Sequence, residues 1–124
     1  MSESGLQSSV IQYINLQYPK IRYCASLGGQ YQKYPSQRNK AKATGYVRGF
    51  PDLQICEARG GYFGLFLEIK EKGYPTKEQK KWIEDLNERG YFAKCVKGLD
   101  EIIETIDSYM TKNQSIRWLY EEGK

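Results

Sequence analysis

Two short apolar runs separated by a pair of glycines place the strongest limit on how this chain folds. Leu53 to Glu57 and Tyr62 to Lys70 have the composition of strands, and Arg59-Gly60-Gly61 stands between them. Adjacent glycines at that spacing are typical of a tight β-hairpin. The sequence therefore predicts an antiparallel strand pair near the middle of the chain.

The hairpin predicts that two carboxylates meet. Side chains alternate between the faces of a strand, so Glu68 and Lys70 share one face. A turn centred near Gly60 places Asp52 opposite Glu68, whereas a slip of one residue would turn Asp52 to the other face. Opposed Cβ atoms lie about 4.5–5.5 Å apart. Two carboxylates that close repel unless a proton or cation lies between them, and a divalent metal with oxygen ligands fits there.

Lys70 would stand beside this metal pair, where it can orient or deprotonate a water or stabilise charge on a phosphate oxygen. A metal and a lysine together suit hydrolysis of a phosphodiester. Taken alone, Glu-x-Lys on a strand is commonly a pair of solvated edge charges, and an aspartate after proline is often a turn residue. The hairpin spacing and the basic segment before it favour the catalytic interpretation.

The chain has 124 residues and no histidine, which excludes Ser-His-Asp and Cys-His catalysis and the common zinc sites. Its three dispersed cysteines indicate reduced thiols in a reducing compartment such as the cytoplasm. No apolar run approaches the roughly 18 residues that span a membrane, and no signal peptide is evident. We expect one domain over residues 1–124, with a basic loop at 27–48 and a short tail at 111–124.

The remaining periodicity predicts helices on both sides of the strands. Thr76 and Gln79 form the pattern of a capping box, and Gly90 would end that helix. Asp100 is the expected cap of a last helix, and Trp118 and Leu119 suggest a short helix in the tail. The other predicted elements are a helix over 3–16, strands over 21–26 and 91–97, and core positions Ile102, Ile103, Ile106, Tyr109 and Met110 in the last helix. The predicted fold class is α/β, a mixed sheet flanked by helices in the order α-β-β-β-α-β-α.

The segment from residue 27 to 48 is basic and has no clear period. It contains no acidic residue, and its cations are Lys33, Arg38, Lys40, Lys42 and Arg48. Such a loop is a candidate for sequence-independent phosphate contacts, with Tyr31, Tyr34 and Tyr46 placed to stack on unpaired bases. The alternative is an ordinary solvated loop.

Several of these motifs together resemble a known nuclease family. The runs 49–53 (Gly-Phe-Pro-Asp-Leu) and 64–70 (Gly-Leu-Phe-Leu-Glu-Ile-Lys), followed by Gln79, are similar to the PD-(D/E)XK pattern. The run 75–79 with Trp82 is similar to its VRR-NUC branch, the virus-type replication-repair nucleases. The resemblance covers roughly residues 3–110 and implies a restriction-endonuclease-like core, dependence on Mg²⁺ or Mn²⁺, and cleavage of DNA.

The resemblance also assigns roles to residues. It implies that Asp52, Glu68 and the main-chain carbonyl of Ile69 bind the metal and that Lys70 is the catalytic lysine. It suggests that Gln79 faces the active centre as well as capping its helix. An acidic residue of the first helix often joins the site; Glu3 is the only acid before Asp52, and Gln7, one turn later, is the alternative.

The leading hypothesis is thus a metal-dependent DNA endonuclease. The resemblance implies a homodimer acting on branched DNA such as four-way junctions or flaps, and the compact form suggests a phage- or virus-encoded protein in the host cytoplasm. One alternative is a non-catalytic DNA-binding module with the same fold. Another is a protein-interaction domain with a tyrosine-rich surface, since the chain has eleven tyrosines.

Overall fold

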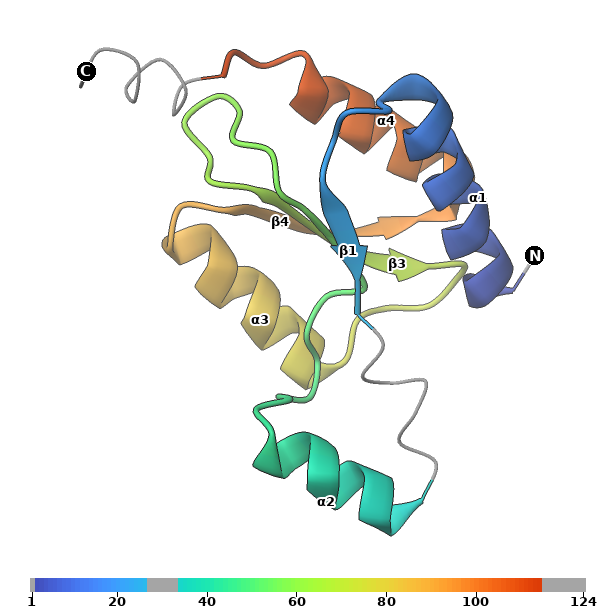
Figure 1. The fold of residues 1–124 in the computed structure, drawn as a ribbon, viewed down its shortest axis with the longest axis vertical. Coiled ribbons are helices and arrows are strands. Elements are labelled where there is room, and N and C mark those ends of the chain that lie inside the picture. The colour runs from blue at the N-terminus through green and yellow to red at the C-terminus, as the bar shows by residue number, and fades with distance from the viewer. Residues whose placement is uncertain (1, 27–33, 115–124) are drawn as a thin grey trace.

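The computed structural model describes residues 2–26 and 34–114, and its centre is a four-stranded sheet in the order β1-β2-β3-β4 (Figure 1). The pairs β1–β2 and β2–β3 are antiparallel, whereas β3–β4 is parallel. In chain order the elements are α1 (Glu3–Gln17), β1 (Tyr23–Ala25), α2 (Pro35–Ala43), β2 (Leu53–Ile55), β3 (Leu65–Lys70), α3 (Lys77–Glu88), β4 (Phe92–Lys97) and α4 (Gly98–Met110).

Helices cover both faces of the sheet, as Figure 1 shows. Leu65, Leu67 and Ile69 of β3 belong to a buried cluster with the apolar residues of α1 and α4. Phe66 points the other way and packs with Leu86 and other residues of α3. The alternation of β3 therefore separates two cores, and the predicted α/β class, a mixed sheet flanked by helices, is confirmed.

The predicted hairpin and its register are confirmed. Gly60 and Gly61 have φ of 57° and 87°, the positive values that a two-residue turn of this kind requires. The main chains of Arg59 and Tyr62 exchange two hydrogen bonds across it, of 3.2 and 2.8 Å. The strands pair Leu53 with Leu67, Gln54 with Phe66 and Ile55 with Leu65. This strand pairing is centred on Gly60, as predicted.

The helix α3 begins with the predicted capping box. The Thr76 hydroxyl accepts a hydrogen bond from the main-chain N–H of Gln79 at 3.2 Å, and the Gln79 side chain accepts one from the Thr76 N–H at 2.8 Å. Gly90 follows the helix with φ of 94° and ends it, as expected. These caps fix the start of α3, and with it the position of Gln79.

The prediction of a loop over 27–48 is wrong for residues 35–43, which form α2. Pro35 stands at the first helical position, and the Gln37 side chain accepts a hydrogen bond from the Tyr34 N–H at 3.2 Å. No residue of α2 is buried, so this helix has no apolar period by which the sequence could reveal it. The order thus gains a helix between β1 and β2.

The cap predicted for the last helix is also wrong. The helix α4 begins at Gly98, with Lys97 as its N-cap, and Asp100 lies inside the first turn. The Glu101 carboxylate accepts a hydrogen bond from the Lys97 N–H and so satisfies the helix start in place of Asp100. The expected helix around Trp118 and Leu119 falls outside the described residues.

Two expectations from composition agree with the structure. Cys24, Cys56 and Cys95 are free thiols. Among the helices of the described ranges, none has the length and apolar character needed to cross a membrane.

Candidate active site

A cleft of about 140 Å³ opens where β2 begins and β3 ends, and it gathers residues from distant parts of the chain. Asp52 and Glu68 lie in it, together with Gln7 of α1 and Gln79 of α3. The remaining lining residues are Ser26, Tyr46, Gly49 and Phe50. Five side chains singled out in the sequence, those of Gln7, Tyr46, Asp52, Glu68 and Gln79, therefore share one cavity.

Asp52 is held toward β3 by main-chain donors. Its Oδ2 accepts a hydrogen bond from the N–H of Ile69 at 2.8 Å, and its own carbonyl accepts one from the N–H of Ser26 at 2.8 Å. Because Leu53 pairs with Leu67, Asp52 continues the register to the position of Glu68 and shares its face of the sheet. The two carboxylates are thus neighbours, as the hairpin predicted.

The main-chain carbonyl of Ile69 faces the same edge. A strand residue that hydrogen-bonds toward one neighbour directs its N–H and C=O to the same side, and the Ile69 N–H points to Asp52. The register places Pro51 opposite Ile69, and proline has no N–H to donate to that carbonyl. The arrangement leaves this oxygen beside the carboxylates.

Glu68 is a charged residue buried in the core, with an exposed fraction of 3%. Its Oε1 lies 4.0 Å from the Lys70 Nζ, whereas its Oε2 is buried with no hydrogen-bond partner among the described residues. Burial and the adjacent carboxylate of Asp52 raise the pKa of Glu68 to about 8, against the opposing effect of Lys70. A buried oxygen without a partner is costly, which indicates that a cation belongs there.

The pKa of Asp52 is also raised, mainly by burial, although the Ile69 N–H counteracts this. The charge of Glu3 raises the pKa of both Asp52 and Glu68, so the start of α1 acts electrostatically on the pair. Glu3 itself is exposed and does not line the cleft. Gln7 therefore lies in the cavity, whereas Glu3 lies outside its lining and acts on the two carboxyl groups through its charge.

The donor set fits a hard divalent cation. Within residues 2–26 and 34–114, no cluster of three or more histidine, cysteine or acidic side chains could bind a metal. Two carboxylates with one main-chain carbonyl suit Mg²⁺, which is usually bound through few protein ligands and keeps several waters. The partnerless Oε2 of Glu68 is the observation that supports this fit.

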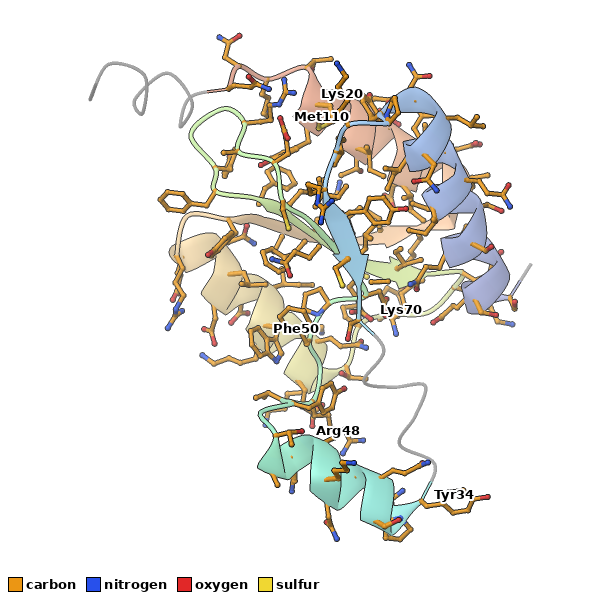
Figure 2. All side chains as sticks on the ribbon, in the orientation of Figure 1. Lys20, Tyr34, Arg48, Phe50, Lys70 and Met110 are labelled. Atoms are coloured by element: carbon orange, nitrogen blue, oxygen red, sulfur yellow. The ribbon has the colours of Figure 1, made fainter. Side chains whose placement is uncertain are left out.

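The predicted DNA-contacting cations lie away from the cleft. Lys40 and Lys42 are exposed on α2, as is Arg38, and Figure 2 shows this helix standing off the end of the molecule that holds Lys70. Arg48 follows α2, and its carbonyl accepts a hydrogen bond from the Trp82 indole at 3.1 Å, which ties the segment to α3. Lys33 and Tyr31 fall outside the described residues.

Sequence reasoning missed three residues of the cleft. Ser26 follows β1, and only the pairing of β1 with β2 brings it there. Gly49 has φ of 92°, and a Cβ there would lie 2.8 Å from the main chain of Glu78, so the close approach requires glycine. Phe50 packs edge-to-face on Trp82 with ring centroids 5.0 Å apart. Their position directly before Pro51-Asp52 was the available signal for Gly49 and Phe50.

Comparison with known proteins shows similarity to a solved structure. Neither the protein-family models nor the curated proteins contain a match to this chain. A solved structure described as a "VRR_NUC domain protein" is 35% identical, covers 92% of each chain, and superposes with a TM-score of 0.79. Sequence and fold are therefore shared over nearly the whole of both chains.

Proposed function

The chain belongs to the VRR-NUC family, and from this membership we propose that it is a metal-dependent DNA endonuclease that hydrolyses phosphodiester bonds in branched DNA. Membership makes it a nuclease-type domain. The dependence on Mg²⁺ or Mn²⁺ and the preference for four-way junctions or flaps are the proposal.

One observation supports the proposal most directly, the burial of Glu68 beside Asp52 with one carboxylate oxygen left without a partner among the described residues. A domain that only needed a stable sheet would gain from an apolar residue at this position, because burying a carboxyl group with one oxygen left without a hydrogen-bond partner is costly. Titratable groups with strongly shifted pKa values in a cleft are typical of catalytic sites. The unfavourable burial of the Glu68 carboxyl group is therefore explained if it binds a divalent cation.

Each side chain has a role that follows from its place. Asp52, Glu68 and the Ile69 carbonyl would hold the metal, which when bound polarises the phosphoryl group and lowers the pKa of water. The Lys70 ammonium, 4.0 Å from Glu68, is placed to orient the attacking water or to neutralise charge on a phosphate oxygen. Gln79 uses its Oε1 in the helix cap, so its amide N–H groups are the part available to donate in the cleft.

The DNA would approach from the end of the molecule that carries α2. Lys40, Lys42 and Arg38 give this helix positive charge without any acidic residue between 27 and 48. Tyr46 lies between α2 and Asp52 in the chain and lines the cleft. A homodimer is part of the proposal, because cutting two strands of one junction needs two active centres.

Cleavage of a labelled panel tests this function. The panel contains duplex, single strand, flap and four-way junction, each with Mg²⁺, Mn²⁺ or Ca²⁺. We expect the flap or junction to be cut with Mg²⁺ or Mn²⁺, and Ca²⁺ to support binding without cleavage. Glu68→Gln and Lys70→Ala should each lower the cleavage rate by at least about 100-fold, the scale of losing a transition-state charge contact.

The matched control is Glu104→Gln, an equal change of charge at an exposed position on α4, which should cleave like the wild type. Full metal-dependent activity of Glu68→Gln in a contaminant-free preparation would show that the site assignment is wrong. The binding-only alternative predicts no cleavage of any substrate and no Mn²⁺ binding by calorimetry.

A further inference from the structure

Tyr74 is a large aromatic residue left in solvent shortly after the strand that carries Glu68 and Lys70. It follows β3 by four residues, in the loop that runs from Lys70 to the cap of α3, and its exposed fraction is 81%. The other strongly exposed aromatic residues of the described ranges, Tyr34 and Phe63, are 56% and 55% exposed. Since exposed apolar surface is unfavourable in water, a ring this open is a candidate for contact with a ligand.

Lys97 connects Tyr74 to the active centre. In the parallel pairing of β3 with β4, Lys97 is the partner of Lys70 and lies on the same face of the sheet. Its Nζ stands 3.8 Å from the centroid of the Tyr74 ring. The ion pairs of the described residues do not include Lys97: the Glu101 carboxylate accepts a hydrogen bond from its main-chain N–H, and its ammonium lies over the Tyr74 ring.

An aromatic face and a cation next to a phosphodiester site fit one nucleotide. We propose that Tyr74 stacks on an unpaired base beside the cleaved bond while Lys97 contacts the phosphate of the same strand. This inference rests on the proposed nuclease function and gives it a structural basis for preferring DNA with unpaired nucleotides.

The occupant is unpaired rather than paired DNA for a physical reason. In a duplex the face of each base is covered by its neighbours, so a protein ring can stack only where a base has left the helix. Stacking of bases on aromatic side chains is nearly independent of sequence, since every base has a π-face. The site would therefore recognise the structure of the DNA and not its sequence.

Binding in Ca²⁺ tests the site without requiring cleavage. The affinity for a flap with unpaired nucleotides is compared with that for a fully paired duplex of the same length by fluorescence anisotropy. We expect Tyr74→Ala to weaken binding of the flap by about 5- to 100-fold and binding of the duplex by less, so that the ratio of the two affinities falls. Tyr74→Phe, which keeps the ring, should hold the ratio within about threefold of the wild type.

Lys97→Ala should weaken binding of both substrates and lower the slope of log affinity against log salt by about 0.7–0.9, the range for one phosphate in single-stranded or duplex DNA. Two controls match these changes: Leu16→Ala removes an apolar side chain that is 84% exposed on α1, and Lys94→Ala removes a lysine from the opposite face of β4. Both should bind like the wild type.

The two proposals fail separately. A wild-type protein that cleaves DNA, with an affinity ratio unchanged by Tyr74→Ala, would overturn the nucleotide site alone. An equal loss on flap and duplex would overturn it too, because it would show a general and not a stacking effect. A wild-type protein without cleavage that still showed the Tyr74-dependent preference would overturn the nuclease function and support the nucleotide site.

Discussion

At the scale of single residues, Glu68 is unfavourable for the stability of the fold, because its carboxyl group is buried in the core. It lies in β3, where the residues from Leu65 to Ile69 are otherwise apolar, and it is 3% exposed. Burial and the adjacent Asp52 raise its pKa to about 8, so the metal-free pair retains one proton near neutral pH. The pair is thus prepared to exchange that proton for a cation.

This shift makes the stability of the metal-free protein depend on pH. The pKa of Glu68 is about 8 in the folded protein and 4.5 ordinarily, so between these values the folded state holds a proton that the unfolded chain has lost. Its contribution is fully present below pH 4.5 and is lost as pH rises toward 8. Glu68→Gln cannot ionise, and we expect it to gain about 1–3 kcal/mol over the wild type between pH 5 and pH 8.5, with screening reducing the full effect.

Thermal unfolding in EDTA across this pH range measures the difference, and Glu104→Gln, at an exposed position, should follow the wild type at every pH. Parallel curves for the wild type and Glu68→Gln would contradict the shifted pKa. Added Mn²⁺ should stabilise the wild type more at high pH than at low pH, because binding displaces the proton.

At the scale of elements, the first turn of α3 serves both folding and the cleft. Thr76 and Gln79 cap the helix reciprocally, and Gln79 also lines the cavity. The helix crosses from β3 to β4, so its start lies at the end of β3 that carries the site. A single capping motif therefore positions an amide beside the carboxylates.

Substitutions at the two capping positions separate these roles. Thr76→Ala removes the hydroxyl acceptor but keeps the main-chain N–H that holds the Gln79 side chain. It should lower the free energy of unfolding by about 1 kcal/mol while leaving the cleavage rate unchanged. Gln79→Ala should cost a similar stability and also lower the cleavage rate by at least about tenfold, because it removes a donor from the cleft. Denaturant unfolding and single-turnover cleavage measure the two effects. Equal cleavage rates for the two variants would restrict Gln79 to capping.

At the scale of the whole molecule, charge is distributed unevenly. The net charge is +4. The basic residues of α2 stand at one end of the molecule, and Lys20 and Met110 mark the opposite end (Figure 2). Acidic residues gather on α4, which carries Asp100, Glu101, Glu104 and Asp107. Such asymmetry orients a polyanion toward the end that holds α2 and the cleft.

The salt dependence of DNA binding tests this orientation. Lys40→Gln combined with Lys42→Gln should lower the slope of log affinity against log salt by about 2, because each phosphate that a lysine no longer neutralises reduces it by about 0.9. The control is Lys20→Gln combined with Lys112→Gln, an equal change of charge at Lys20 and just after Met110, near the opposite end, and it should keep the wild-type slope. Equal slopes for the two double variants would show that α2 does not contact the backbone.

Several features of the site could be predicted from local periodicity alone. Alternation along β3 put Glu68 and Lys70 on one face, and the glycine turn set the register that brings Asp52 to them. The capping box at Thr76 fixed the start of α3. These features could be predicted because each depends on residues near one another in the chain.

The other features of the site depend on packing between segments that are far apart in the chain. Gln7 and Ser26 reach the cleft because α1 packs on the sheet and β1 pairs with β2, and neither contact leaves a local pattern. The helix α2 has no apolar face to reveal it. Lys97 stands beside Lys70 through a parallel pairing whose two strands are separated by a whole helix. Contacts between distant segments are set by packing of the whole core, and for that reason no short stretch of this sequence encodes them.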